Sequence, residues 1–254
     1  MLNLAKISAI FCAAVFLALP CISKAAPLGT VDIAYTGPGA YDTMNIWADG
    51  YEGITGNAGV YMLEKTGGTG EGNFWPNGQI GSFCVEWAEE ASSSTLTYNV
   101  IMPENGPLPT TFLGSTMGVT KAKYIEELWG KHFNSAWVGS CAFSDYYDHG
   151  AAAFAAAIWE IVHEELPISP LSWDVTVDGT AGSRGFRAEY LDAYVANTAN
   201  TWLHSLNGTG PTADLRIFSY NGHQDFIVEV PEPATIALLG LGGMFALLRK
   251  KRAK

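Results

Sequence analysis

The two ends of the chain differ in character from everything between them, and this limits where a folded domain can lie. Apolar runs occupy residues 7–19 and 234–248, and basic residues border each run. Between them, residues 26–230 contain 7 basic and 24 acidic residues, which gives a net charge of 7 − 24 = −17. An acidic body repels nucleic acid and anionic lipid, so the sequence disfavours both as partners. We therefore expect one folded body, residues 26–230, between two targeting segments.

Residues 1–25 have the pattern of a secretory signal peptide. Lys6 supplies the positive start, an apolar run follows to Leu19, and Ser23-Lys24-Ala25 offers small residues at a cleavage point. An anchored first helix is the alternative interpretation. The pattern predicts export of the body.

The other end combines prolines, an apolar run and basic residues. Pro231 and Pro233 fix the backbone and remove two donors, so this stretch stays extended and exposed. A helix over residues 234–248 would span about 22 Å, less than the roughly 30 Å hydrocarbon core, and is a marginal transmembrane helix. The basic tail, residues 249–254, holds this end in the cytoplasm and places the body outside. The orienting residues are Arg249, Lys250, Lys251 and Arg252.

These three parts resemble the PEP-CTERM sorting signal of Gram-negative bacteria. The match runs from Val230-Pro231-Glu232-Pro233 through the glycine-containing apolar helix to the basic tail, so residues 231–254 form a sorting segment. The resemblance implies recognition by an exosortase, a membrane cysteine protease, and association with exopolysaccharide-producing cells. It predicts an intermediate anchored in the inner membrane by the C-terminal helix, then delivery to the periplasm, cell surface or extracellular matrix. A tail anchor behind a proline linker is the alternative.

Two cysteines remain once the signal peptide is removed. Cys84 and Cys141 then lie in an oxidising compartment, where disulfides persist. A bridge between them would close a loop of 141 − 84 = 57 positions. In the chain-entropy model such a bridge contributes about 4 kcal/mol. We predict the bridge, and two buried free thiols are the alternative.

The pattern of the body changes along its length. Short β-favouring runs separated by glycine and proline fill the first half, and apolar residues at helical spacing follow after residue 120. We predict an α+β fold: a strand-rich sandwich or barrel-like body with an inserted helical section, plus the N-terminal signal helix and the short C-terminal transmembrane helix. The predicted strands are 30–35, 44–48, 59–64, 80–87, 95–102, 173–177, 215–220 and 226–229. The predicted helices are 120–130, 148–166 and 186–206.

Three short motifs in the body resemble those of bacterial surface thioester domains. They are Phe83-Cys84-Val85-Glu86, Lys123-Tyr124-Ile125 and Ala157-Ile158-Trp159-Glu160. In that family the cysteine thiol attacks a glutamine carboxamide, expels ammonia and leaves an internal thioester that reacts with amines.

The chain departs from this family at the glutamine. The resemblance places that residue two positions before Ala157, where the chain has Ala155. The exported body has only two glutamines, Gln79 and Gln224, and neither is expected near that helix. We therefore predict a thioester-domain-like scaffold without the reaction, in which Cys84 is available for the disulfide.

Aromatic residues in loops are the remaining candidate contacts. Trp75 lies in the loop-like stretch Phe74-Trp75-Pro76-Asn77, and a tryptophan face with polar neighbours suits a sugar ring. No pattern predicts a catalytic residue, a metal site or a cofactor. We expect a non-enzymatic protein of the cell surface or exopolysaccharide matrix, as in biofilms. The alternatives are a carbohydrate-binding module that uses exposed aromatics and a secreted glycan hydrolase.

Overall fold

The computed structural model describes residues 26–48, 51–86, 89–108, 116–139, 148–177, 185–189 and 192–232. The expected signal segment, residues 1–25, lies outside these ranges. So do Cys141 and the tail from Pro233 onward, including the expected transmembrane helix. Among the described residues, no helix has both the length and the apolar character needed to cross a membrane.

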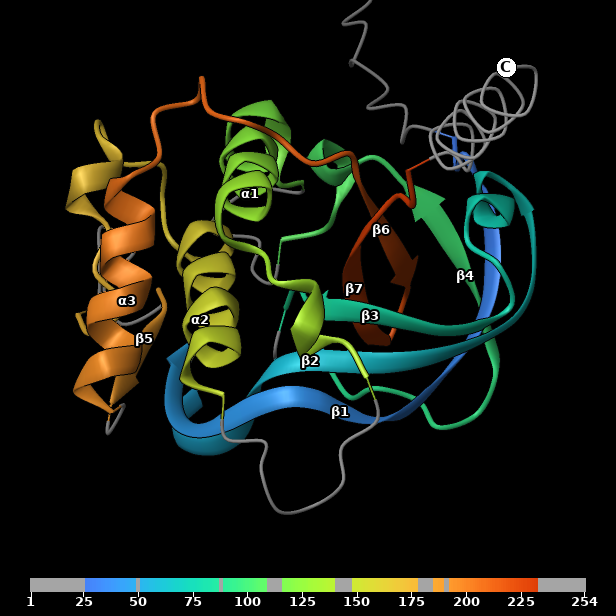
Figure 1. Ribbon diagram of the computed structural model, residues 1–254, viewed down its shortest axis with the longest axis horizontal. Coiled ribbons are helices and arrows are strands. Elements are labelled where there is room, and N and C mark those ends of the chain that lie inside the picture. Colours follow the sequence, from blue (N-terminus) through green and yellow to red (C-terminus); the bar gives the residue numbers. More distant parts are fainter. Residues whose placement is uncertain are drawn as a thin grey trace, which may run out of the picture.

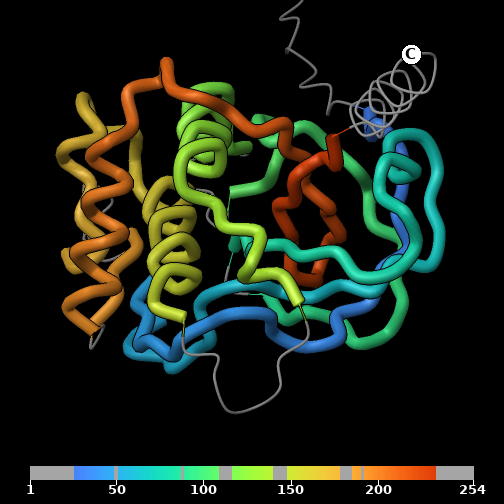
Figure 2. The backbone as a smooth tube through the Cα atoms, viewed as in Figure 1, coloured from blue at the N-terminus to red at the C-terminus, as the bar shows by residue number. Residues whose placement is uncertain are grey.

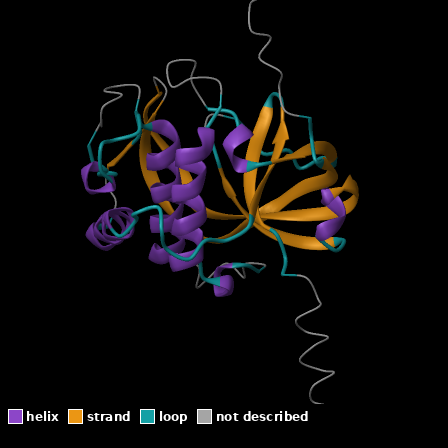
Figure 3. Ribbon diagram, turned by 90° about the horizontal axis from the view of Figure 1, so that it is seen from above, coloured by secondary structure: helices purple, strands orange, loops and turns teal. Residues whose placement is uncertain are grey.

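Antiparallel strands form most of the described body. Their order in the sheet is β2-β3-β7-β6-β4-β1-β5, and β2 also pairs with β1. This last pairing closes six of the strands into a barrel, which lies to one side of the helices (Figure 3). Within the barrel, closure pairs each of these strands on both sides. The strands are β1 (Gly29–Ala48), β2 (Tyr51–Gly70), β3 (Gly78–Cys84), β4 (Leu96–Ile101), β5 (Arg187–Glu189), β6 (Leu215–Tyr220) and β7 (His223–Glu229).

The strands β1 and β2 are unusually long and connect the barrel to the helices. Each has 20 residues, whereas strands of five or six residues are usual. One half of this hairpin belongs to the barrel, where Ile33 of β1 pairs with Leu96 of β4. The other half continues beneath α2, where Ile46 pairs with Ala188 of β5 (Figures 1 and 2). The hairpin therefore fixes the barrel relative to the helical section.

Three α-helices lie beside the barrel, with α3 packed on the side of α2 that faces away from it: α1 (Gly118–His132), α2 (His149–His163) and α3 (Ala193–His204) (Figure 1). The helix α2 is central, and every residue from Ala151 to His163 is buried. Its alanine-rich first half gives high helix propensity and lets β1, β2 and α3 approach closely. Asp148 caps it, because its Oδ1 accepts a hydrogen bond from Ala151 N at 3.0 Å. The short 3₁₀ helices are Glu71–Phe74, Pro103–Asn105, Ser135–Trp137 and Pro170–Ser172.

Two apolar cores result from this arrangement. One fills the barrel and includes Tyr98 and Phe226. The other lies between barrel and helices, where Phe83 packs on Phe154 with ring centroids 4.8 Å apart. Cys84 belongs to the second core, although its strand partner Phe226 belongs to the first. Cys84 thus lies where the two cores meet.

The observed elements confirm most of the predicted ones and favour the barrel form of the predicted fold. The strand expected over residues 173–177 is wrong, because this segment is a turn in which Asp174 Oδ1 accepts from Thr176 N at 3.0 Å. The helix expected from residue 186 is also wrong at its start. Residues 187–189 instead form β5 against β1, and α3 begins at Ala193. In both places tertiary contacts override the local apolar spacing.

Candidate functional site

Cys84 is the last residue of β3 and is almost fully buried, with 2% of the residue exposed. Its Sγ donates a hydrogen bond to the backbone oxygen of Glu86 at 2.7 Å. The Nε2 of Gln224, on β7, donates to that same oxygen. The strand register brings the Cys84 and Gln224 side chains together, because Cys84 pairs with Phe226 and Val85 N donates to Asp225 O at 3.0 Å. A thiol and a carboxamide therefore converge on one carbonyl.

Two further side chains reach the same sulfur from other elements. Tyr61 of β2 is coupled electrostatically to Cys84, and Trp159 of α2 and Gln224 both lower the pKa of its thiol. Trp159 Nε1 has no hydrogen-bond partner among the described residues. Four elements of the fold, β2, β3, β7 and α2, thus surround this thiol.

The electrostatics of the site keep the Cys84 thiol and the Glu86 carboxyl protonated. Burial raises the pKa of the Cys84 thiol well above its ordinary value, and the acidic groups of Glu86 and Asp225 raise it further. The neighbouring Trp159 and Gln224 side chains lower this pKa but do not compensate. Burial also raises the pKa of Glu86 to about 8, and the negative charge of Asp225 adds to the shift. The thiol is therefore protonated and weakly nucleophilic at neutral pH.

The arrangement permits one kind of chemistry, acyl transfer between neighbours. The carbonyl carbon of a carboxamide is an electrophile, and a thiol held beside it reacts far faster than one in solution. The Tyr61 hydroxyl and the Trp159 indole N–H are donors that can stabilise negative charge on an oxygen. Burial of the cluster keeps bulk water from competing.

The structure changes what the sequence suggests about the two glutamines. Ala155 lies on α2 one turn before Trp159, is 2% exposed, and offers no acyl group. Gln224, far from Cys84 in the sequence, shares the Glu86 O acceptor with its thiol and lowers the pKa of that thiol, as Trp159 of α2 does, so the expectation that Gln224 lies away from this helix is wrong. Gln79 is exposed at the far end of β3, where it pairs with Glu64. The rarity of glutamine in the body was a usable signal, but nothing local linked Gln224 to Cys84.

The predicted disulfide is not tested, since Cys141 lies outside the described residues. Within them, Cys84 is a free and buried thiol. The bridge between these two cysteines stays a prediction.

The tryptophan expected to contact a glycan is a core residue. Trp75 is 3% exposed, its Nε1 donates to Glu229 O at 2.8 Å, and its ring packs edge-on against Phe218 at 4.9 Å. The 3₁₀ turn before it directs the indole into the barrel and leaves Phe74 outside, 49% exposed. The expected sugar contact at Trp75 is therefore corrected: its face is not accessible.

The start of the sorting segment follows β7 directly. Val230 N donates to Asp214 O at 2.8 Å, and Pro231 and Glu232 are exposed beyond that bond. Pro233 and the basic residues Arg249, Lys250, Lys251 and Arg252 lie outside the described residues. The folded body thus ends immediately before the Pro-Glu-Pro stretch.

No group of three or more histidine, cysteine or acidic side chains within the described ranges is arranged to hold a metal ion. Residues 229–252 match the PEP-CTERM protein-sorting motif. This confirms the resemblance in the tail and indicates an exported protein targeted to exosortase. No curated protein and no solved structure matches the chain.

Proposed function

We propose that the chain is an exported, non-enzymatic protein of the cell surface or exopolysaccharide matrix. The N-terminal signal exports it, the C-terminal helix holds it in the inner membrane, and exosortase then processes the tail. The observation that supports this route is the exposure of Pro231 and Glu232 directly after β7, within the matched motif. Because the barrel is complete before this segment, cleavage there would leave the fold intact.

The proposed role of the body is that of an acidic, thioester-domain-like scaffold. Its charge of −17 over residues 26–230 favours solubility within a hydrated polysaccharide layer. Sugar binding by this body is the alternative within the same proposal, and glycan hydrolysis is the less favoured one.

C-terminal peptide mapping tests the proposed route. The full chain is expressed in a bacterium that carries exosortase and in the same strain lacking it, and protein is recovered from membranes and medium. We expect the tail peptides to disappear only when exosortase is present. Glu232→Gln should retain the tail, and Glu52→Gln, an exposed glutamate on β2, should behave as wild type. Identical C-terminal peptides with and without exosortase would contradict the proposal.

A second candidate function is an internal thioester between Cys84 and Gln224. The observation that favours it is the shared acceptor, because Cys84 Sγ and Gln224 Nε2 both donate to Glu86 O. In the reaction, Sγ bonds to the Gln224 carboxamide carbon, the C–N bond breaks, and the nitrogen leaves as ammonia with the thiol proton. The glutamine that supplies the acyl group in thioester domains would thus lie on β7 instead of α2.

The intact mass of the exported body shows whether the internal thioester forms. A thioester makes the exported body lighter by one ammonia, and a disulfide makes it lighter by two hydrogens. If the thioester forms, Gln224→Glu abolishes the ammonia loss, whereas Gln79→Glu, the matched control on β3, keeps it. Methylamine should then add to the wild type and expose a titratable thiol. A wild-type body of full mass excludes this second function.

A further inference from the structure

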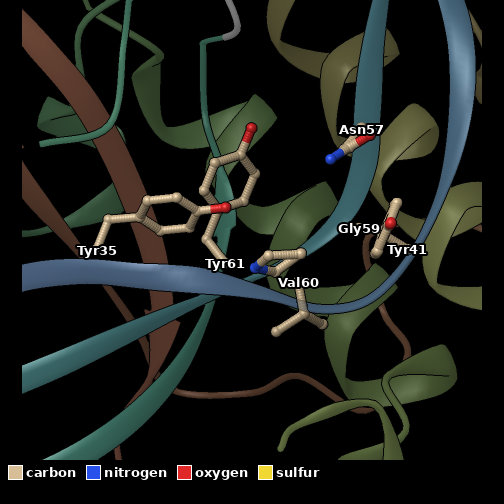
Figure 4. A pocket seen from close by; sticks show the side chains of 7 residues that line it. Tyr35, Tyr41, Asn57, Gly59, Val60 and Tyr61 are labelled. Atoms are coloured by element: carbon tan, nitrogen blue, oxygen red, sulfur yellow. The ribbon is translucent and has the colours of Figure 1, made fainter. Parts of the chain in front are cut away.

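A hollow lies on the β1–β2 hairpin, and Tyr61, which lines it, is also a neighbour of the Cys84 thiol. The volume of the hollow is about 150 Å³. Figure 4 shows Tyr35 and Tyr61 on one side of it and Tyr41 and Asn57 on the other. The full lining consists of Tyr35, Pro38, Tyr41, Asn57, Gly59, Val60 and Tyr61.

Irregular pairing of the two strands creates the hollow. The register of β1 against β2 shifts between Tyr35 and Gly37, and again between Pro38 and Tyr41. Each shift inserts residues into β1 that have no counterpart in β2, which bends the strand locally. Opposite them stands Gly59, with a φ of +153°, where a Cβ would collide with the Ala40 carbonyl oxygen. The close approach of the two backbones therefore requires this glycine.

The side chains around the hollow have one chemical character. The tyrosines provide apolar ring faces with a hydroxyl that can donate and accept, and Asn57 adds an exposed carboxamide that can do both. No charged side chain is part of the lining. Such a surface suits a neutral ligand that has apolar C–H faces and many hydroxyl groups.

The aromatic wall is held in place by its neighbours. The rings of Tyr35 and Tyr61 lie 5.4 Å apart, and Tyr61 packs on Phe226 inside the barrel at 5.8 Å. Ser82 Oγ donates to the backbone oxygen of Tyr61 at 2.9 Å, which ties this part of β2 to β3. A wall fixed before binding loses little conformational entropy when a ligand arrives.

We propose that this hollow binds one neutral sugar residue of a polysaccharide, a step that rests on the sugar-binding alternative of the proposed function. A site of 150 Å³ is well below the roughly 300 Å³ at which sites for drug-sized ligands begin, so it takes a single ring whose chain neighbours remain in solvent. The charge of −17 on residues 26–230 disfavours acidic sugars. The hollow replaces Trp75 as the place of sugar contact.

Saturation-transfer NMR tests the proposal on the full chain, purified in a detergent without a sugar headgroup. The probes are glucose, galactose, mannose and N-acetylglucosamine, with glucuronate and galacturonate as acidic counterparts. We expect transfer to at least one neutral sugar and little to either uronate. Tyr41→Ala and Asn57→Ala should each reduce that transfer several-fold. Tyr51→Ala, an exposed tyrosine outside the hollow, should leave it unchanged.

Each outcome of this experiment bears on the hollow alone. Because the Asn57 side chain is exposed, its removal should leave the thermal unfolding midpoint unchanged even if Tyr41→Ala unfolds the chain. Absence of transfer to every neutral sugar overturns the proposal, as does transfer that survives in both variants or is equal for the uronates. Export is scored separately by C-terminal mapping, so a failure here leaves the sorting route untouched.

Discussion

Two buried carboxylates, Glu127 and Glu86, have opposite surroundings. Glu127 on α1 is 0% exposed, accepts from Gly208 N at 2.6 Å and pairs with Lys131 Nζ at 2.6 Å. Asn207 N and Gly210 N also donate to it, at 3.1 and 3.2 Å. Burial alone would raise the pKa of Glu127, but Lys131 and these backbone N–H groups outweigh it and lower that pKa. This carboxylate is ionised and fully hydrogen-bonded.

Glu86 is 7% exposed and lies beside other acids, Asp225 and Glu89. Burial, Asp225 and Glu89 together raise its pKa to about 8, against a weaker opposing hydrogen bond from the Asp225 backbone. A satisfied buried charge is typical of a structural anchor, here one that attaches the loop of residues 207–210 to α1. Buried groups with shifted pKa values around a thiol are instead typical of a functional site. The contrast separates the structural part of the molecule from the candidate site.

The largest expected effect on stability comes from removing the Glu127 carboxylate, which anchors the loop of residues 207–210. Glu127→Ala leaves the Asn207, Gly208 and Gly210 amides without their acceptor, so we expect a loss of about 3 kcal/mol in the free energy of unfolding. Denaturant titration monitored by tryptophan fluorescence measures it. Glu126→Ala, at the half-buried neighbouring position, should change that free energy far less. Equal losses of unfolding free energy in the two variants would show that Glu127 does not anchor this loop.

The pH dependence of this anchor has a definite sign. Because the pKa of Glu127 is lower in the folded protein than in the unfolded chain, its stabilisation is present above the unfolded value and is lost as pH falls through the folded value. The wild type should therefore lose stability in acid more steeply than Glu127→Gln.

Glu86 should show the opposite sign. Its folded pKa of about 8 lies above the ordinary value of 4.5, so the folded state binds the extra proton and stability declines as pH rises between these values. Glu86→Gln removes this decline, and we expect a gain of about 2 kcal/mol above pH 8. Unfolding curves measured across this range check it, with Glu104→Gln on the Pro103–Asn105 turn as the control. If the decline in stability with rising pH persists in Glu86→Gln, a group other than Glu86 causes it.

Sequence reasoning succeeded where local pattern decides the structure. Asp148 before an alanine run predicts the start of α2, and short β-favouring runs predict the strands β6 and β7. It failed for the surroundings of Cys84, because the contact with Gln224 depends on the pairing of β3 with β7 across 224 − 84 = 140 positions. It also failed for Trp75, whose burial depends on the turn that precedes it. Local sequence identifies the motif residues, but which residues surround them depends on strand pairing in the closed barrel.

The smallest expected effect concerns the thiol itself. In Cys84→Ala the Glu86 carbonyl keeps Gln224 Nε2 as a donor, so this buried oxygen stays hydrogen-bonded. For the free thiol that the described residues show, only a sulfur atom is lost from the core, and we expect a decrease of about 1 kcal/mol in the free energy of unfolding. The predicted bridge to Cys141 would raise this loss to about 4 kcal/mol in Cys84→Ala and leave Gln224→Glu unaffected. A covalent link between Cys84 and Gln224 would close a loop of 140 positions, and its loss would cost about 4 kcal/mol or more. Denaturant titration of Cys84→Ala beside Gln224→Glu therefore measures whether the two side chains are merely neighbours: a small loss in the first variant means an unlinked pair, and a large loss of similar size in both means a bond.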